Sequence, residues 1–398
     1  MKIAIYSDQF YPELSGISDS VATLGSELAR RGHAVHFFVP RYSKRDYEKV
    51  GVPDTDGALG ERTLITRFPA FATKTPSGQG RTVVPTPWHW HAARAFGPDI
   101  IHTHLFSGAG IEALIASRKL HVPLVGTNHS AVKGYTQFYP PPREFVAHMM
   151  LKFLNWYYNH CEFVTAPSQS LLNEMREAGF TAPSRPLSNP IDVKTFRPLP
   201  NADTFRQRFG LSESTIIFAS HLSAEKNIDV LIRALAIVKK GIPAVELALA
   251  GTGPSTDDLR RLAASQGVER AVKFLGFLEK PALAEAYNAS KAFAIASTVE
   301  TQSMVTMQAM ASGIPVIAAN ARALPEYVSA ANGFLVEPGN VRAFAEKMIY
   351  LLTHESARAA LGENARKSAE AFSIKTIVDE WERIYHRVIE ERKHKTEK

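Results

Sequence analysis

The sequence predicts an α/β protein built from two doubly wound, Rossmann-like domains, and three observations lead to this prediction. The chain has 398 residues, more than a single hydrophobic core usually organises. In both halves, short apolar runs alternate with helical patterns, as they do in a parallel sheet covered by helices. Residues 186–198 are rich in proline and turn-forming residues, and we interpret them as the linker between the halves.

The expected elements follow one another with a similar rhythm in each half. In the first half, strands are expected at residues 3–6, 34–39, 100–102, 124–127 and 163–166, and a helix at 20–31. In the second half, strands are expected at residues 216–220, 246–250, 272–275, 292–296 and 316–318, and helices at 227–239, 256–266 and 303–311. We therefore place the first domain at residues 1–188 and the second at residues 189–375.

Residues 376–398 are expected to form a final helix with a basic end. One side of this helix carries apolar side chains at helical spacing, namely Ile377, Trp381, Ile384, Tyr385 and Val388. We expect this side to pack back across the first domain.

Composition narrows the class of protein. Hydrophobic residues make up 45% of the chain and charged residues 21%, as in ordinary globular domains, and no apolar run approaches the length of a membrane span. The single cysteine, Cys161, cannot form an intramolecular disulfide, so we expect a cytoplasmic protein. A net charge of +7 favours anionic partners, such as nucleotides or an anionic membrane surface at the inner face of the membrane. Nucleic acid is not expected as a partner, because no motif for its recognition is present.

The most informative segment is residues 297–318, which reads as a strand end, a polar loop, a helix and another strand. This order places Glu300 at the rim of a parallel sheet, where ligands of such sheets bind. The helix that follows directs free N–H groups and a partial positive charge toward the same place. A phosphate group is therefore the expected ligand.

Several motifs occur in a characteristic order along nearly the whole chain. They are I-I-H-T-H at 100–104, T-N-H-S at 127–130, N-P-I-D-V-K-T-F-R-P at 189–198, S-A-E-K-N at 223–227, A-G-T-G-P at 250–254 and F-L-G-F at 274–277. Together with the segment around Glu300, they make the chain resemble the retaining nucleotide-sugar glycosyltransferases of family 4. That resemblance implies the GT-B architecture, in which the two domains face each other across a cleft, and a nucleotide sugar as co-substrate.

The resemblance also implies roles for individual residues. Lys226 would meet the negative charge of the leaving diphosphate, Glu300 would bind hydroxyls of the donor sugar, and His129 would lie against that sugar near the reacting centre. The remaining donor-binding positions implied by the family are Gly16, Gly251, Gly253, Phe277, Thr301, Gln302, Ser303 and Met304. Each catalytic candidate has a plainer alternative: a solvated lysine at a helix start, an exposed loop carboxylate and a packed histidine, respectively.

Three positions depart from the family pattern. Ser15 stands before Gly16 where the family commonly has paired glycines, and the other two departures concern the donor-binding side chains of the second half. His221 stands where the family has an arginine, and Gln308 stands where it has the glutamate that holds the ribose hydroxyls. Histidine is not a permanent cation, and a glutamine oxygen accepts without charge assistance, so donor affinity is what these changes affect. They also support an alternative of another class, a catalytically degenerate protein that binds a nucleotide sugar or acts as a scaffold.

The acceptor is indicated by residues 132–163. Phe145, Met149, Lys152, Phe153, Trp156 and Tyr157 recur there at helical spacing, which is typical of an interfacial helix but also of a buried one. This neighbourhood resembles bacterial enzymes that glucosylate diacylglycerol. The expected reaction is therefore transfer of glucose from UDP-glucose to a lipid or glycan hydroxyl, with GDP-mannose-dependent mannosylation of a phosphatidylinositol-type lipid as the alternative.

Asp19 and Tyr135 are candidates for contact with the acceptor, although a helix N-cap just before Ser20 explains Asp19 better. No general base is evident, which agrees with the resemblance. No metal or other cofactor is expected, because His89 and His91, His102 and His104, and the pair at positions 54 and 56 lack complementary ligands at zinc-like spacing. A sugar epimerase or a phosphorylase is disfavoured, since no lysine-anchored pyridoxal signature is present.

Overall fold

The computed structural model describes residues 1–13, 15–50, 59–73, 80–139, 141–200 and 202–396. Positions 54 and 56, considered above as metal ligands, lie outside these residues. The chain divides into two compact units: Met1–Pro190 together with Ile374–Lys398, and Ile191–Ser373. The chain thus leaves the first unit within the proline-rich stretch and returns to it at the start of the last helix.

The first unit contains a seven-stranded parallel sheet in the order β3-β2-β1-β6-β7-β8-β9. Its strands are β1 (Lys2–Tyr6), β2 (Ala34–Pro40), β3 (Thr63–Phe68), β6 (Ile100–Thr103), β7 (Leu124–Thr127), β8 (Phe163–Ala166) and β9 (Ser184–Pro186). A small antiparallel pair, β4 (Ala70–Ala72) and β5 (Arg81–Val83), stands beside it. The strand order reverses between β1 and β6, so this is the switch point at which doubly wound sheets bind ligands.

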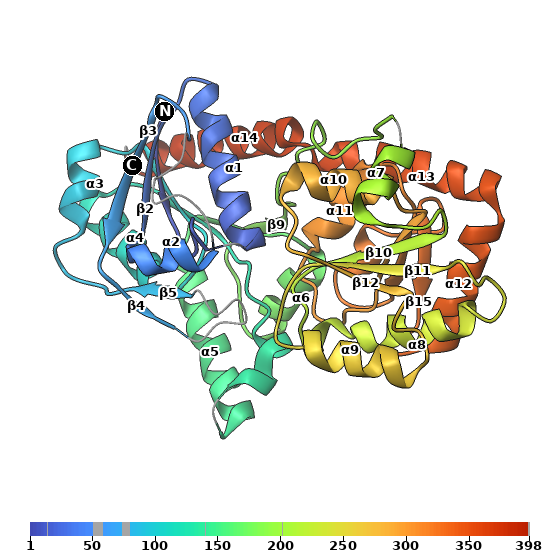
Figure 1. The fold of residues 1–398 in the computed structure, drawn as a ribbon. Helices are drawn as coiled ribbons and strands as arrows, with labels where there is room; N and C mark the ends of the chain where they lie inside the picture. Colours follow the sequence, from blue (N-terminus) through green and yellow to red (C-terminus); the bar gives the residue numbers. More distant parts are fainter. Residues whose placement is uncertain (14, 51–58, 74–79, 140, 201, 397–398) are drawn as a thin grey trace. The chain divides into compact units, whose positions relative to one another are not determined.

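Helices cover both faces of this sheet, and β1 shows how (Figure 1). Ile3 and Ile5 point into a core shared with α1 (Gly16–Arg30) and α14 (Ile374–Thr396), whereas Ala4 and Tyr6 point into the opposite core. The two-residue period of a strand produces this division. The opposite core contains side chains of α3 (Trp90–Phe96), α4 (Gly108–Leu120), α5 (Arg143–Tyr158) and α6 (Gln169–Glu177). The remaining helices of the unit are α2 (Lys44–Val50) and the short helix η1 (Val132–Phe138).

The second unit contains a six-stranded parallel sheet in the order β12-β11-β10-β13-β14-β15. Its strands are β10 (Thr215–Ala219), β11 (Glu246–Ala250), β12 (Val272–Gly276), β13 (Ala292–Ile295), β14 (Val316–Ala319) and β15 (Gly333–Val336). Within this unit, α8 (Ile228–Val238), α9 (Thr256–Ser265) and α12 (Val341–Thr353) lie on one side of the sheet, and α7 (Ala202–Phe209), α10 (Lys280–Asn288), α11 (Met304–Ala311) and α13 (Glu355–Ala369) on the other (Figure 1). Three short helices, η2 (Ala224–Lys226), η3 (Leu324–Glu326) and η4 (Glu370–Phe372), complete it. The switch point here is between β10 and β13, and the predicted fold class is confirmed for both sheets.

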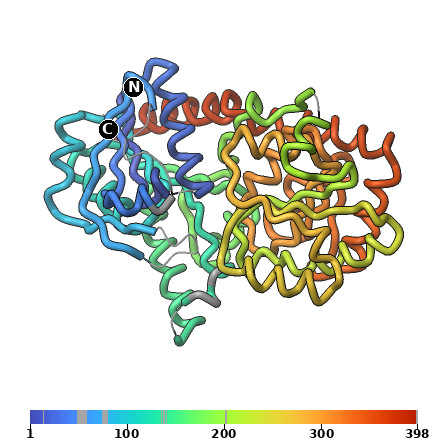
Figure 2. The backbone as a smooth tube through the Cα atoms, in the orientation of Figure 1, coloured from blue at the N-terminus to red at the C-terminus, as the bar shows by residue number. Residues whose placement is uncertain are grey.

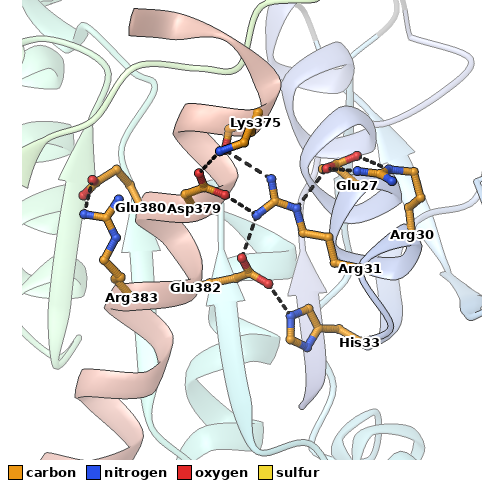
Figure 3. Close-up of polar contacts among 9 residues, drawn as sticks. All are labelled: Glu27, Arg30, Arg31, His33, Lys375, Asp379, Glu380, Glu382 and Arg383. Carbon is orange, nitrogen blue, oxygen red and sulfur yellow. Dashed lines mark hydrogen bonds and ion pairs between the residues drawn. The ribbon is translucent and has the colours of Figure 1, made fainter.

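The last helix, α14, belongs to the first unit, and the chain's two ends lie in that unit (Figure 2). The five apolar side chains singled out on this helix are all buried, in the same cluster as Ile3 and Ile5. Ion pairs connect the polar side of α14 to the C-terminal end of α1 (Figure 3). The Arg31 guanidinium bonds Asp379 and Glu382, each at 2.6 Å, and Glu27 at 2.9 Å, while His33 contacts Glu382 at 2.7 Å.

Helix α1 begins earlier than the sequence suggested. Its N-cap is Ser15, whose Oγ accepts a hydrogen bond from the backbone N–H of Ser18 at 3.1 Å. The alternative role of Asp19 as N-cap is therefore wrong. Asp19 lies in the first turn of α1, where its negative charge interacts favourably with the positive end of the helix dipole.

Helix α5 is buried on one side and exposed on the other. Phe145, Met149, Phe153 and Trp156 are 62%, 48%, 41% and 46% exposed, and Lys152 is exposed beside them. Tyr157, which we grouped with them, is completely buried and donates its hydroxyl to the carbonyl of Gly110. Among the described residues, no helix combines the length and apolar content needed to cross a bilayer.

Candidate active site

At the switch point of the second unit, a lysine and a glutamate form an ion pair. Lys226 follows β10 and Glu300 follows β13, and the two strands are neighbours in the sheet. Lys226 Nζ lies 2.7 Å from Glu300 Oε1, and the side chains are only 12% and 11% exposed. The strand order therefore brings together two residues that are 74 positions apart in the chain.

Asn227 connects the loop that carries Lys226 with the loop that carries Glu300. Its backbone is left-handed, with φ of 49°, and it is the N-cap residue of α8. Its amide Nδ2 donates to the carbonyl of Ala296 at 3.2 Å and to Thr298 Oγ1 at 3.4 Å. Because left-handed backbone is tolerated best by glycine and asparagine, this residue type suits the position. The contact ties the loop of Lys226 to the loop of Glu300.

The turn after Glu300 presents its backbone rather than its side chains. Ser303 has a left-handed φ of 77° and shares a hydrogen bond with Thr306 at 2.7 Å. Gln302 is buried and donates to Met307 Sδ at 3.1 Å. The side chains of Ser303 and Gln302 are therefore engaged within the protein, and those of Thr301 and Met304 are partly buried. The groups of this turn that can bind an anion are the first backbone N–H groups of α11.

Three buried polar atoms of the second unit lack a hydrogen-bond partner among the described residues. One is Glu225 Oε2, on η2, and the other two lie at predicted donor-binding positions. They are His221 Nε2, in the loop after β10, and Gln308 Oε1, on α11. A buried acceptor or donor left alone is costly, so a ligand that satisfies it gains that free energy on binding. Both atoms belong to the positions at which the sequence departs from the family pattern.

The glycine turn after β11 has a structural reason of its own. A Cβ at Gly251 would lie 1.9 Å from the carbonyl oxygen of Ser220, and one at Gly253 would lie 2.3 Å from that of Leu222. These glycines let the turn pack against the loop that carries His221, and Gly251 also has a φ of 143°. Phe277, after β12, is 57% exposed and is available as a surface for a base.

At the switch point of the first unit, three histidines form a buried stack. His102 lies on β6, His104 follows β6 and His129 follows β7. The rings of His102 and His104 are 4.0 Å apart, and His104 Nδ1 lies 3.2 Å from His129 Nε2. Burial lowers the pKa of His129 to about 3 and lowers the pKa of the other two well below the usual value. All three rings are therefore neutral at pH 7.

His102 lies at one end of the stack, and both of its ring nitrogens form hydrogen bonds. Its Nδ1 lies 2.7 Å from the hydroxyl of Tyr385 on α14, and its Nε2 lies 2.8 Å from Thr127 Oγ1. From the sequence, His102 and His104 were considered as metal ligands and disfavoured, and Tyr385 was expected only to pack. The rings stack rather than converge, and no group of three His, Cys, Asp or Glu suited to a metal occurs in the described part of the chain. The I-I-H-T-H motif at 100–104 was the sequence signal that could have indicated the functional importance of His102 and His104.

The other first-unit candidates are placed as follows. Gly16 is the first residue of α1 and is exposed, and Asp19 is half-buried one turn below it. Tyr135 lies within η1, but its side chain is outside the described residues. Asp19 and Tyr135 remain predictions.

Two family models match the chain, one for each half. Residues 14–195 match the model described as Glycosyltransferase Family 4, and residues 201–368 match the model described as Glycosyl transferases group 1. The chain belongs to the family 4 glycosyltransferases. It is an enzyme, a hexosyltransferase.

The curated relatives of this glycosyltransferase include enzymes whose names differ in the sugar they transfer. Alpha-monoglucosyldiacylglycerol synthase of Streptococcus pneumoniae is 28% identical over 330 residues, covering 80% of this chain and 71% of that protein. A GDP-mannose-dependent alpha-mannosyltransferase of Mycobacterium tuberculosis is 28% identical over 382 residues, covering 96% and 95%. Both are similar to this enzyme over most of its length.

The fold of the glycosyltransferase also has solved counterparts. The structure of Anabaena Alr3699/HepE in complex with UDP superimposes with a TM-score of 0.76 at 22% identity, covering 97% of this chain and all of that one. At this identity the likeness concerns the fold, which is GT-B, as predicted.

Proposed function

We propose that this enzyme transfers glucose from UDP-glucose to a hydroxyl of diacylglycerol, with retention of the anomeric configuration. The Lys226–Glu300 pair at the switch point of the second sheet carries the proposal. It supplies a cation for the diphosphate and a carboxylate for sugar hydroxyls at the place where such sheets bind ligands. The name of the S. pneumoniae relative supports glucose and diacylglycerol.

Each group around the pair has a part in holding the donor. The diphosphate binds Lys226 and the first N–H groups of α11, because developing negative charge is stabilised best by donors already in place. Gln308 Oε1, buried and unpartnered among the described residues, accepts from a ribose hydroxyl. Phe277 offers its exposed ring and backbone to the base. In the first unit, His129 contacts the donor sugar.

The reaction needs no protein base. The acceptor hydroxyl oxygen forms its bond to the anomeric carbon on the face from which UDP leaves, and the bond from that carbon to the phosphate oxygen breaks with its electron pair. The departing phosphate oxygen takes the hydroxyl proton. The protein positions the reactants and stabilises the developing charge. Lys226 stabilises the negative charge that develops on the departing diphosphate. We propose that the reaction requires no metal ion or other cofactor.

We further propose that α5 docks the enzyme on an anionic membrane surface as a peripheral protein at the cytoplasmic side. Four large apolar side chains, Phe145, Met149, Phe153 and Trp156, are exposed along one side of this helix. Arg143 and Lys152 are exposed on the same helix, against the single acid Glu144. Apolar side chains insert between headgroups while cations attract anionic lipids, so this combination suits a bilayer surface.

Co-sedimentation with vesicles tests the docking. The wild type should bind phosphatidylglycerol vesicles more strongly than phosphatidylcholine vesicles, and a Phe145→Ser, Trp156→Ser double variant should lose about tenfold or more in binding. Trp88→Ser is the matched control, because Trp88 is an exposed aromatic of the same unit outside α5. Equal binding by both variants would contradict the docking role of α5.

The second candidate function is mannosyl transfer from GDP-mannose to a phosphatidylinositol-type lipid. The name of the M. tuberculosis relative, which aligns with nearly the whole chain, favours GDP-mannose as the donor, and the lipid acceptor is the one implied by the sequence resemblance. The same Lys226–Glu300 pair would serve either donor, so the base and the acceptor are what distinguish the two.

A matrix of donors and acceptors decides between them. Purified enzyme is incubated with UDP-glucose, UDP-galactose or GDP-mannose, each with vesicles containing diacylglycerol or phosphatidylinositol, and the lipid products are identified by mass spectrometry. Glucosyl-diacylglycerol with the α configuration supports the proposal. Mannosylated phosphatidylinositol supports the second candidate, and transfer from none of the donors contradicts both.

A further inference from the structure

The histidine stack of the first unit contains a contact that bears on the reaction. His104 Nδ1 and His129 Nε2 are 3.2 Å apart, and both side chains are buried. Each ring is neutral, since burial lowers the pKa of both well below the ordinary value. A neutral imidazole carries one N–H, and the hydrogen bonds around it decide which nitrogen holds the proton.

Two arrangements of protons fit the contact. In the first, the Nδ1–H of His104 donates to Nε2 of His129, so that His129 carries its own proton on Nδ1. In the second, the Nε2–H of His129 donates to Nδ1 of His104, so that His104 carries its proton on Nε2.

The second ring nitrogen of His104, Nε2, distinguishes between these two arrangements. His104 Nε2 is buried and has no hydrogen-bond partner within the described residues. The second arrangement leaves an N–H there, whereas the first leaves only a lone pair. Orphaned buried N–H groups are rarer in proteins than under-satisfied acceptors, so the first arrangement is favoured.

The ring of His104 is itself held in place. It packs against the ring of His102, with the ring centroids 4.0 Å apart and the planes tilted by 35°, and both nitrogens of His102 are already engaged, by Tyr385 and Thr127. His102 therefore supports the ring of His104 without competing for its Nδ1.

We propose that His104 is a positioning residue that fixes His129 in the tautomer with its proton on Nδ1, so that His129 meets its ligand as a hydrogen-bond donor at that atom. This inference rests on the proposed function, in which His129 contacts the donor sugar. It adds the direction of that contact: Nδ1–H of His129 donates to a sugar oxygen, and His104 keeps it in that state between turnovers.

Nitrogen NMR of protein labelled with ¹⁵N at histidine tests the tautomer directly. The signals of His129 are assigned by their loss in His129→Gln. In the wild type, Nδ1 should be the protonated nitrogen of His129. In His104→Leu, which removes the donor, the proton should redistribute toward Nε2. In His104→Asn, whose side-chain amide can place an N–H near the original Nδ1, the proton should stay on Nδ1.

Kinetics provide the second readout. His104→Leu should lower kcat/KM for sugar transfer about tenfold, and His104→Asn should restore most of the loss. His36→Leu controls for removal of a buried histidine elsewhere in the same unit and should leave transfer unchanged.

The outcomes separate the inference from the proposed function. A proton on Nε2 of His129 in the wild type overturns the inference, and this measurement stands even if His104→Leu does not fold. An unchanged His129 tautomer in His104→Leu overturns it as well. A shifted tautomer with unchanged transfer supports the positioning contact and contradicts the role of His129 in the reaction.

Discussion

Lys226 Nζ and Glu300 Oε1 are in contact at 2.7 Å, each on a loop that follows one of two adjacent strands. In the proposed function a diphosphate binds the same lysine. Donor binding must then exchange one anion for another on Lys226, which releases the Glu300 carboxylate to accept hydroxyls of the sugar. In the proposed function the ion pair is thus a resting arrangement, in which each nearly buried charge compensates the other until the donor binds.

Replacing the carboxylate of Glu300 should separate nucleotide binding from turnover. In Glu300→Gln, Lys226 loses a competing anion, so the Kd for UDP should stay the same or fall. The transfer rate should fall about 100-fold or more, because the sugar loses its carboxylate partner. Calorimetry with UDP and initial rates of transfer measure the two effects. The exposed Glu269→Gln is the control, and a parallel loss of UDP affinity and turnover in Glu300→Gln would contradict this division of roles.

Charge at position 308 should change the affinity for the ribose. If Gln308 Oε1 accepts a ribose hydroxyl, Gln308→Glu makes that hydrogen bond charge-assisted and should tighten UDP binding by up to about tenfold, whereas Gln308→Leu should weaken it. The control lies in the ligand: 2′,3′-dideoxy-UDP lacks the hydroxyls and should not distinguish the wild type from Gln308→Glu. Equal effects on both nucleotides would rule out the ribose contact.

Two neighbouring arginines should differ in their contribution to stability. Arg31 bonds Glu27, Asp379 and Glu382 and is 15% exposed, whereas Arg30 bonds Glu27 and is 72% exposed. Arg31→Met leaves two carboxylates of α14 without their shared partner and should lower the free energy of unfolding by about 1–3 kcal/mol. Arg30→Met should have little effect. Urea unfolding measures both, and similar losses in the two variants would argue against α14 being anchored by Arg31.

The buried histidines should make the enzyme less stable below neutral pH. The pKa of His129 is about 3 when folded and near 6.5 when unfolded, so the unfolded chain binds a proton first. The stability from neutral burial is complete above pH 6.5 and is lost as pH falls, by roughly 1.4 kcal/mol per pH unit for each such histidine. Urea unfolding between pH 6.5 and pH 5 should show a smaller slope in His129→Gln than in the wild type. The exposed His354→Gln is the control, and an unchanged slope in His129→Gln would count against neutral burial.

Part of the fold could be predicted because its signals are local. The strands expected at residues 246–250 and 124–127 coincide with β11 and β7, since each is a short, mostly apolar run between turn formers. Strand β3 was missed because its residues alternate less clearly and most are only half-buried. Helix α1 was predicted to begin too late, because both Ser15 and Asp19 are suitable caps and only backbone geometry distinguishes them.

The site depended on information that periodicity does not contain. Lys226 and Glu300 were assigned by resemblance, and their contact follows from the pairing of β10 with β13, two strands that are not consecutive. The contact between His104 and His129 was missed for the same reason, because each histidine was weighed alone. Strand order in a doubly wound sheet is what turns separate motifs into one site.

Binding of UDP-glucose to Lys226→Met tests the central claim most directly. Calorimetry would compare the wild type, Lys226→Met and Lys240→Met, the last replacing an exposed lysine of the same unit. If Lys226 holds the diphosphate, Lys226→Met should raise the Kd about tenfold or more, while Lys240→Met leaves it unchanged. A Lys226→Met variant that binds UDP-glucose as tightly as the wild type would contradict the account.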